Sequence, residues 1–164
     1  MKKLITSLCL IVTLAFGSFG VGWSGDFQKG VDAYEKGDYA TALKEWTPLA
    51  DQGHAKAQYN LGVAYANGEG VLQDYKTAVK WYILSAEQGY AKAQYNLGVT
   101  YALGQGVIED KVYAHMWANI ANSNGHENGK KLMEFLLEQG ITPSQIEKAQ
   151  DLARECVKKN YKGC

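Results

Sequence analysis

The chain contains one 17-residue stretch twice, and this repetition constrains its fold more than any other feature. Residues 55–71 read AKAQYNLGVAYANGEGV and residues 91–107 read AKAQYNLGVTYALGQGV, so the two copies differ at only three positions. They lie 36 residues apart, and the same step relates Gly53, Gly89 and Gly125. Self-similarity at a fixed step of this length is typical of stacked repeats, in which each unit buries its apolar face against its neighbours. The sequence therefore predicts a solenoid.

Helical signals continue along the chain from Asp26 onward. Apolar residues recur at spacings of three and four, and glycines follow the ends of the periodic segments. Asp38, Asp74 and Asp110 stand one step apart, where their carboxylates can cap the second helix of each unit. Together these signals predict an all-α protein, a right-handed superhelical α/α solenoid of four helix-turn-helix pairs. The helices with definite predicted bounds cover residues 39–52, 55–67, 75–88, 91–103, 111–123 and 131–138.

Two groups of glycines in the repeats have separate explanations. Gly62 and Gly98 lie within predicted helices, where glycine costs about 1 kcal/mol relative to alanine. We therefore expect close packing of a neighbouring helix against them. The G-x-G loops at residues 68–70 and 104–106 are expected to need positive φ angles. They follow helices rather than strands, which argues against a phosphate-binding loop.

The N-terminal residues have the features of a secretory signal peptide. Lys2 and Lys3 precede a run that is apolar over residues 8–16 and then rich in glycine and serine. A transmembrane anchor is the alternative, but a span needs about 20 consecutive apolar residues and this core is shorter. We expect cleavage between Gly17 and Ser24, no stable membrane insertion afterwards, and a periplasmic or secreted protein.

Charge composition argues against nucleic acid as a partner. The chain has 17 basic and 17 acidic residues, and removal of Lys2 and Lys3 leaves a small acidic excess. A near-neutral domain without a basic patch has no electrostatic attraction for nucleic acid or anionic lipid.

Cys156 and Cys164 are the two cysteines that follow the signal peptide, and they are predicted to form a disulfide. A zinc site needs four ligands, and no histidine or further cysteine lies near this pair in the sequence. We therefore expect no metal and no cofactor. Closing so short a loop contributes about 2–3 kcal/mol at most, by holding the end of the chain. The bridge is expected to be structural rather than redox-active.

The repeated motif resembles that of the Sel1-like repeat family, a branch of the tetratricopeptide-like α/α solenoids. Ala55 to Val71 carries the first part of the motif, and Asp74, Ala78, Trp81-Tyr82 and 86–89 carry the rest. The second copy departs late, with Ala118 in place of the tyrosine. Together with the signal peptide at 1–22, this resemblance gives the following division: tetratricopeptide-like N-terminal hairpin, 26–53; Sel1-like repeats, 54–89 and 90–125; degenerate C-terminal hairpin with the disulfide, 126–164.

The resemblance implies a scaffold that binds a protein or peptide. An exported, cysteine-rich branch of the family has been linked to β-lactam binding or hydrolysis, which gives the alternative of an envelope enzyme or a module that binds peptidoglycan fragments. That branch fastens each helix pair with a disulfide, whereas Gln58 and Ala86 occupy the corresponding positions here. This departure weakens the transfer of lactamase activity.

A hydrolase would also need a nucleophile, a base and an orienting acid close together. The three histidines, His54, His115 and His126, show no such pattern, and we assign no catalytic residue. We expect a monomer that is not an enzyme.

The candidate binding residues form one stripe on the first helix of each repeat. By similarity to tetratricopeptide repeats this stripe faces the concave surface, and the helical period supports it. Tyrosines offer contact area, while asparagines and lysines can hold a peptide backbone or a carboxylate. The alternative is that the tyrosines only complete packing between repeats. The predicted concave-face residues are Lys56, Tyr59, Asn60, Val63, Asn67, Lys92, Tyr95, Asn96, Val99 and Leu103.

Overall fold

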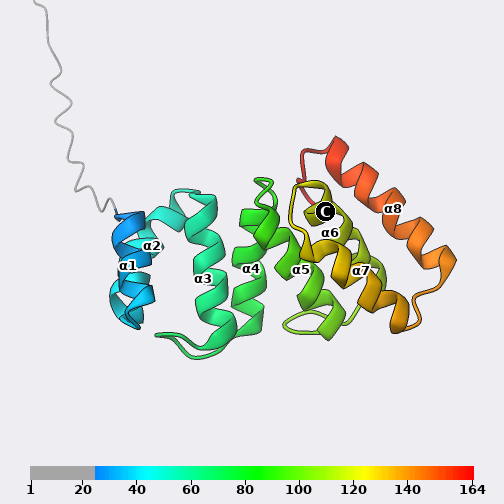
Figure 1. The fold of residues 1–164 in the computed structure, drawn as a ribbon. Helices are drawn as coiled ribbons and strands as arrows, with labels where there is room; N and C mark the ends of the chain where they lie inside the picture. Colours follow the sequence, from blue (N-terminus) through cyan, green and yellow to red (C-terminus); the bar gives the residue numbers. More distant parts are fainter. Residues whose placement is uncertain (1–24) are drawn as a thin grey trace, which may run out of the picture.

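Periodic apolar residues and regular caps fold the chain into helices. The computed structural model describes residues 25–164; the predicted signal peptide lies outside the described residues. Within that range eight helices follow one another and there is no strand (Figure 1). Their bounds are α1 Phe27–Glu35, α2 Tyr39–Asp51, α3 Ala55–Asn67, α4 Tyr75–Ala86, α5 Ala91–Leu103, α6 Lys111–Ser123, α7 Asn128–Glu138 and α8 Pro143–Lys158.

The helices stack as a solenoid, which confirms the predicted fold class. The pairs α1–α2, α3–α4 and α5–α6 are hairpins, and α2 packs on α3 as α4 packs on α5. The last unit is arranged differently. Helices α7 and α8 each make their main contacts with α6, so the final pair closes the array around one helix. Figure 1 shows the C-terminus returning to a position beside α6.

Aspartate caps begin the second helices as predicted. The carboxylates of Asp38, Asp74 and Asp110 accept hydrogen bonds from backbone N–H groups of the following turn. Thr142 and Gln145 form a reciprocal capping box at the start of α8. The structure differs from the prediction at three ends: α2 stops at Asp51 rather than residue 52, α4 stops at Ala86 rather than residue 88, and α7 begins at Asn128 rather than residue 131.

The helical glycines are close-contact sites, as predicted. A Cβ on Gly62 would lie 2.5 Å from the ring of Tyr82, and one on Gly98 would lie 2.9 Å from Leu132. In the loops, Gly68, Gly70, Gly104 and Gly106 all have positive φ angles. Glycine is therefore required for packing in the helices and for backbone conformation in the loops.

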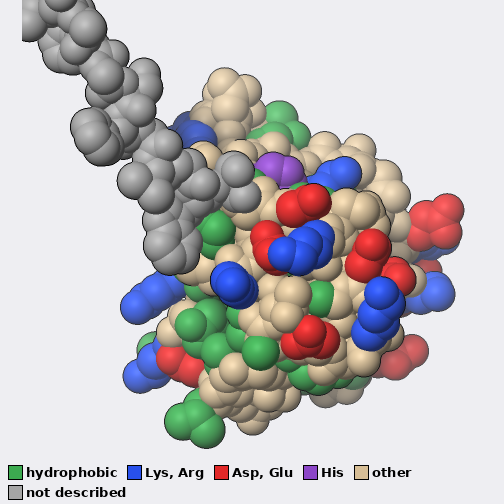
Figure 2. Space-filling view, turned by 90° about the vertical axis from the view of Figure 1, so that its left-hand side faces the viewer, with side chains coloured by type: hydrophobic (Ala, Val, Ile, Leu, Met, Phe, Trp, Pro, Cys, Tyr) green, Lys and Arg blue, Asp and Glu red, His purple; other side chains and the backbone are tan. Residues whose placement is uncertain are grey.

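The core follows the solenoid as three connected groups of buried side chains. Trp46 and Leu61 belong to the N-terminal group, and Trp117 belongs to the central one. Trp81, the equivalent of Trp117 one repeat earlier, is only partly buried, whereas Tyr82 beside it is 3% exposed. Figure 2 shows the α1 end of the array, where acidic and basic side chains are interspersed.

A buried glutamine links neighbouring units. The side chain of Gln58 on α3 donates a 3.0 Å hydrogen bond to the carbonyl of Ala50 in α2. Its oxygen accepts a 2.7 Å hydrogen bond from Gln88, just after α4. One side chain thus joins the ends of three helices.

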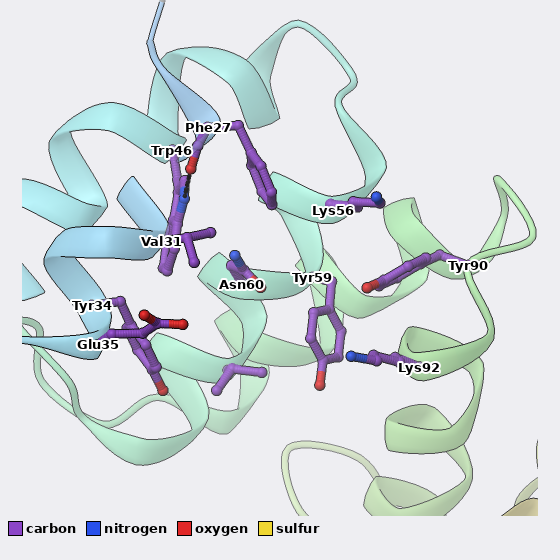
Figure 3. A pocket seen from close by; sticks show the side chains of 11 residues that line it. Phe27, Val31, Tyr34, Glu35, Trp46, Lys56, Tyr59, Asn60, Tyr90 and Lys92 are labelled. Atoms are coloured by element: carbon purple, nitrogen blue, oxygen red, sulfur yellow. Dashed lines mark hydrogen bonds between the residues drawn. The ribbon is translucent and has the colours of Figure 1, made fainter. Parts of the chain in front are cut away.

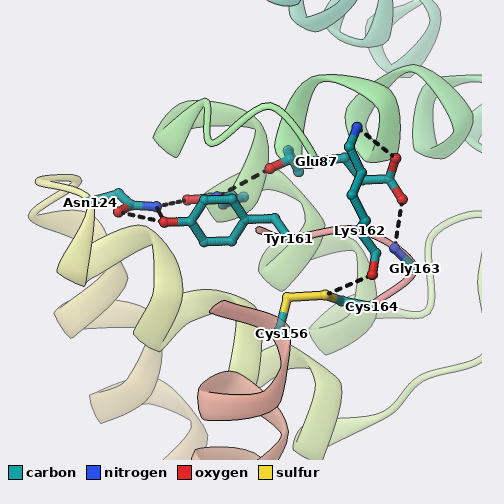
Figure 4. Close-up of a disulfide and its surroundings, with 9 residues drawn as sticks. Glu87, Asn124, Cys156, Tyr161, Lys162, Gly163 and Cys164 are labelled. Carbon is teal, nitrogen blue, oxygen red and sulfur yellow. Dashed lines mark hydrogen bonds and ion pairs between the residues drawn. A yellow bond between two sulfur atoms is a disulfide. The ribbon is translucent and has the colours of Figure 1, made fainter. Parts of the chain in front are cut away.

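Residues 161–164 form what we call the C-terminal clasp. The disulfide between Cys156 and Cys164 anchors the clasp to α8, with a Cα–Cα distance of 5.5 Å. The Gly163 N–H donates a 2.9 Å hydrogen bond to Glu87 at the end of α4. Tyr161 lies 3.2 Å from the Asn124 side chain (Figure 4). The predicted disulfide therefore holds the chain end to α8, and the hydrogen bonds to Glu87 and Asn124 hold it against both repeats.

Across residues 25–164, no helix is both long and apolar enough to span a membrane. The same residues contain no cluster of three or more histidine, cysteine, aspartate or glutamate side chains arranged to hold a metal ion.

Candidate binding groove

A groove of about 440 Å³ lies between the first hairpin, α3 and the start of α5. Figure 3 shows its side chains converging from these elements. Its walls are largely aromatic and aliphatic, with a few polar groups, which is the usual composition of a small binding site. The residues that line it are Phe27, Val31, Tyr34, Glu35, Trp46, Lys56, Tyr59, Asn60, Val63, Tyr90 and Lys92.

Helical periodicity places part of the predicted stripe in this groove. Lys56, Tyr59, Asn60 and Val63 follow one another at spacings of three, one and three residues along α3, so they share one face. The opposite face, which includes Leu61, is buried in the core. The groove is therefore built on a helix that packing holds in place.

Aromatic contacts fix the groove walls. The rings of Tyr59 and Tyr90 meet edge to face with centroids 5.3 Å apart. The Phe27 ring stacks on His54 at 5.0 Å, and the Trp46 ring nitrogen donates to the Phe27 carbonyl at 3.3 Å. Burial raises the pKa of Tyr59 and of Tyr90 above the ordinary value. Both hydroxyls consequently keep their protons at neutral pH and remain hydrogen-bond donors.

The charged groups of the groove lie on opposite sides. Lys56 and Lys92 project from the first turns of α3 and α5, and Glu35 lies across the groove on α1 (Figure 3). Near Glu35, the Tyr34 hydroxyl donates a 2.7 Å hydrogen bond to Glu69. Burial, followed by this hydrogen bond, raises the pKa of Tyr34. One wall is thus basic and the other acidic.

The remaining predicted residues lie outside this groove. Asn67, Asn96 and Val99 line a separate hollow of about 230 Å³ between α3 and α5. The Tyr95 ring stacks on His126 with centroids 4.5 Å apart and packs among residues of the C-terminal core group. Leu103, at the end of α5, is 54% exposed. The stripe that we predicted as one surface therefore occupies several environments.

Six of the lining residues were not predicted. Phe27, Val31 and Tyr34 lie on α1 and Trp46 lies on α2, and no binding role was expected for them. The first three are only partly buried, so one surface of each contributes to the groove. Glu35 and Tyr90 were not considered as binding residues. The signal for Tyr90 is its position directly before the repeated motif, where the other units have His54 and His126.

The histidines have structural surroundings. His54 caps α3, because its Nδ1 accepts a 3.2 Å hydrogen bond from the Ala57 N–H. His115 is 6% exposed, and burial lowers its pKa. The pKa of His126 is also lowered, first by burial and then by the charge of Lys92. Among the described residues, the buried Nδ1 atoms of His115 and His126 have no hydrogen-bond partner.

Comparisons with known proteins agree with this architecture. The model of the Sel1 repeat family matches residues 55–90 and 91–126. No curated protein matches the sequence.

Two solved structures are similar to the chain. One is a protective antigen present in uropathogenic Escherichia coli strains that displays an SLR fold. It is 28% identical with a TM-score of 0.74, and the match covers 80% of this chain and 30% of the antigen. The other is a Sel1 repeat protein from Oxalobacter formigenes. It is 30% identical with a TM-score of 0.66, and the match covers 79% of this chain and 55% of that protein.

The chain therefore spans about a third and about half of these two longer proteins. Sel1-repeat proteins are generally scaffolds for protein–protein interaction, and their fold is typically non-catalytic. This chain therefore contains two Sel1 repeats and shares the solenoid fold of Sel1-like repeat proteins.

Proposed function

We propose that this protein is an exported scaffold of the bacterial periplasm or cell envelope that binds a protein through an extended peptide segment. The groove between α1, α3 and α5 carries this proposal. It combines a preformed aromatic wall with polar groups from three helices. Aromatic side chains provide most of the binding energy in many interfaces, and polar groups around them select the partner.

The size and the rigidity of the groove suit a peptide. A volume of about 440 Å³ accepts a few side chains of an extended segment rather than a folded domain. Tyr59 packs on both Tyr82 and Tyr90, which restricts its side-chain rotation before any ligand arrives. A rigid wall loses little conformational entropy on binding, which favours affinity.

Export is supported by the sequence. The N-terminal pattern of two lysines, a short apolar core and small residues is that of a secretory signal peptide. A disulfide between Cys156 and Cys164 suits an oxidising compartment. Both observations favour the periplasm as the site of action.

The test blocks the groove with a bulky charged side chain. The full-length chain would be expressed, and the purified protein used to select binders from a displayed library of short random peptides. We expect Val63→Arg to abolish binding of the selected peptides, because Val63 lines the groove and is only partly buried. The matched control is Val157→Arg on α8, where the side chain is 49% exposed and away from the groove.

Two results would overturn the proposal. The first is selected peptides that bind the Val63→Arg and wild-type proteins equally, which would place binding elsewhere. The second is a selection that yields no peptide while muropeptides or β-lactams bind the wild-type protein and fail to bind Val63→Arg. That result would replace peptide binding with the glycan or lactam alternative.

A further inference from the structure

The basic wall of the groove consists of two equivalent lysines from successive repeats. Lys56 and Lys92 lie 36 positions apart, each at the second position of its helix, α3 or α5. Both are exposed and both line the same groove. The structural repetition therefore brings two ammonium groups to one side of a single site.

These lysines lack a counter-charge within the described part of the chain. Ion pairs there join Lys29 to Glu45 and four other lysine or arginine side chains to acidic partners, but none includes Lys56 or Lys92. The charge of Lys92 also lowers the pKa of His126. Both ammonium groups are therefore without an ion-pair partner among the described residues.

The acidic groups in and beside the groove lie away from the lysines or already accept other hydrogen bonds. Glu69 accepts hydrogen bonds from the Tyr34 hydroxyl at 2.7 Å and from the Asn67 side chain at 3.2 Å. Glu35 extends from α1 on the wall opposite Lys92, as Figure 3 shows. Neither carboxylate satisfies the lysines.

A tyrosine hydroxyl that can donate a hydrogen bond and two aromatic rings lie beside the basic wall. Lys92 and Tyr90 project from the start of α5 toward Tyr59 on α3 (Figure 3). The Tyr90 hydroxyl is protonated at neutral pH and can donate to an oxygen anion, as the ammonium groups can. The Phe27 and Tyr59 rings offer apolar surface next to these donors.

From this arrangement we infer that the groove recognises an acidic peptide segment, with a carboxylate held between Lys56 and Lys92 and an apolar side chain seated among Phe27, Tyr59 and Tyr90. The inference rests on the proposed function and names the chemical class of its partner. A carboxylate supplies the missing counter-charge, and the adjacent apolar side chain removes aromatic surface from water.

The site is unsuited to a polyanion. Glu35 lies on the facing wall, and a run of phosphates would place negative charge against it. A segment with one or two acidic residues satisfies the lysines without crossing to that wall. Complementary charge of this kind determines which partner binds more than how tightly it binds.

Peptides selected from the random library provide the first measurement. We expect their sequences to be enriched in aspartate or glutamate next to an aromatic or large aliphatic residue. Replacing each acidic residue of a selected peptide by its amide should weaken binding about five-fold or more, because a charged contact is lost at a partly exposed site. Added salt should weaken binding of the acidic peptide and leave binding of the amide peptide nearly unchanged.

Protein variants provide the second measurement. Lys56→Gln/Lys92→Gln should reduce affinity for the acidic peptide about five-fold or more and leave affinity for the amide peptide unchanged. The matched control is Lys44→Gln/Lys80→Gln, which removes two exposed lysines from α2 and α4 that do not line the groove.

The two proposals fail in different ways. Selected peptides that are neutral or basic, yet lose binding with Val63→Arg, would overturn the acidic-peptide inference and support peptide binding in the groove. Acidic peptides whose affinity is unaffected by Lys56→Gln/Lys92→Gln would likewise overturn the inference. Selected peptides that bind the Val63→Arg and wild-type proteins equally would overturn both the acidic-peptide inference and the proposed function.

Discussion

Gln94 on α5 donates its side-chain amide to the backbone carbonyl of Ala86 on α4, 3.2 Å away. The side chain of Gln94 is fully buried, and its oxygen accepts a 2.8 Å hydrogen bond from Asn124 beyond α6. Gln58 makes the equivalent pair of contacts one repeat earlier. The stacking of repeats thus depends on a buried polar side chain as well as on apolar contacts.

Replacing this glutamine should destabilise the protein. Gln94→Leu removes two side-chain hydrogen bonds, one to the Ala86 carbonyl, which keeps its bond from the Gly89 N–H, and one from Asn124. A hydrogen bond typically contributes about 0.5–1.5 kcal/mol, so the loss of two costs about 1–3 kcal/mol. We expect a loss of that size in the free energy of unfolding, measured by urea denaturation. Gln150→Leu on the exposed face of α8 is the control and should change it by less than about 0.5 kcal/mol. An equal effect of the two substitutions would contradict the linking role.

The C-terminal clasp should loosen when its disulfide is removed. Cys164→Ser frees the end that carries Gly163, so its hydrogen bond to Glu87 and the contacts of Tyr161 lose their anchor. We expect a loss of about 2–3 kcal/mol on the loop-entropy estimate, and faster hydrogen exchange at the ends of α4 and α8.

Reduction of the wild-type protein should reproduce this result, and reduction of Cys164→Ser should add nothing. If exchange at the end of α4 is unchanged in Cys164→Ser, the clasp does not hold the repeats together. The contact to Glu87 would then be incidental.

Acid should destabilise the fold through buried histidine. Burial lowers the pKa of His115 below its ordinary value near 6.5, so the unfolded chain binds the proton more readily than the folded protein. The neutral form of His115 therefore makes its full contribution to stability at pH values above the pKa of this histidine in the unfolded chain. This contribution is lost as pH falls below that value toward the folded pKa, by up to about 1.4 kcal/mol per pH unit for one histidine.

His115→Leu should therefore flatten the pH dependence of unfolding between about pH 5.5 and 7, a range above the ordinary pKa values of carboxylates. The control is Met116→Leu at the neighbouring buried position, which should keep the wild-type slope. A slope that survives in His115→Leu would assign the effect to other groups. His126 is the next candidate, because its pKa is lowered in the same direction.

Local signals predicted most of the fold. Capping depends on a few consecutive residues, so the sequence identified the caps Asp38, Asp74 and Asp110. Glycine within a helix is unfavourable relative to alanine, so Gly62 and Gly98 were expected to be sites of close helix contact. The packing of α8 along α6 was not predicted. It depends on contacts between units, which the repeat pattern does not encode at the end of an array.

The groove was only partly predictable for the same reason. Helical period placed Lys56, Tyr59, Asn60 and Val63 on one face, and the structure places all four in the groove. The period could not reveal that the first hairpin supplies the facing wall. Nor could it reveal that identical motifs have different neighbours: Tyr59 faces Tyr90, whereas Tyr95 faces His126.

That difference separates the effects of two otherwise equivalent tyrosines. Tyr59 lines the groove, so Tyr59→Ala should weaken binding of the selected peptides about ten-fold or more, as expected for an aromatic residue central to an interface. Tyr95 stacks on His126 and packs beside the C-terminal core group. Tyr95→Ala should instead destabilise the protein by about 2–4 kcal/mol and leave peptide affinity of the folded protein unchanged.

The two measurements are peptide titration by fluorescence anisotropy and urea denaturation, performed on both variants. Tyr59→Phe and Tyr95→Phe serve as controls because they keep the ring contacts and remove only the hydroxyl. If Tyr95→Ala weakens peptide binding as much as Tyr59→Ala does, the ligand extends along the whole predicted stripe. The binding surface would then extend along α5 beyond Lys92, and the groove between α1, α3 and α5 would be only one part of it.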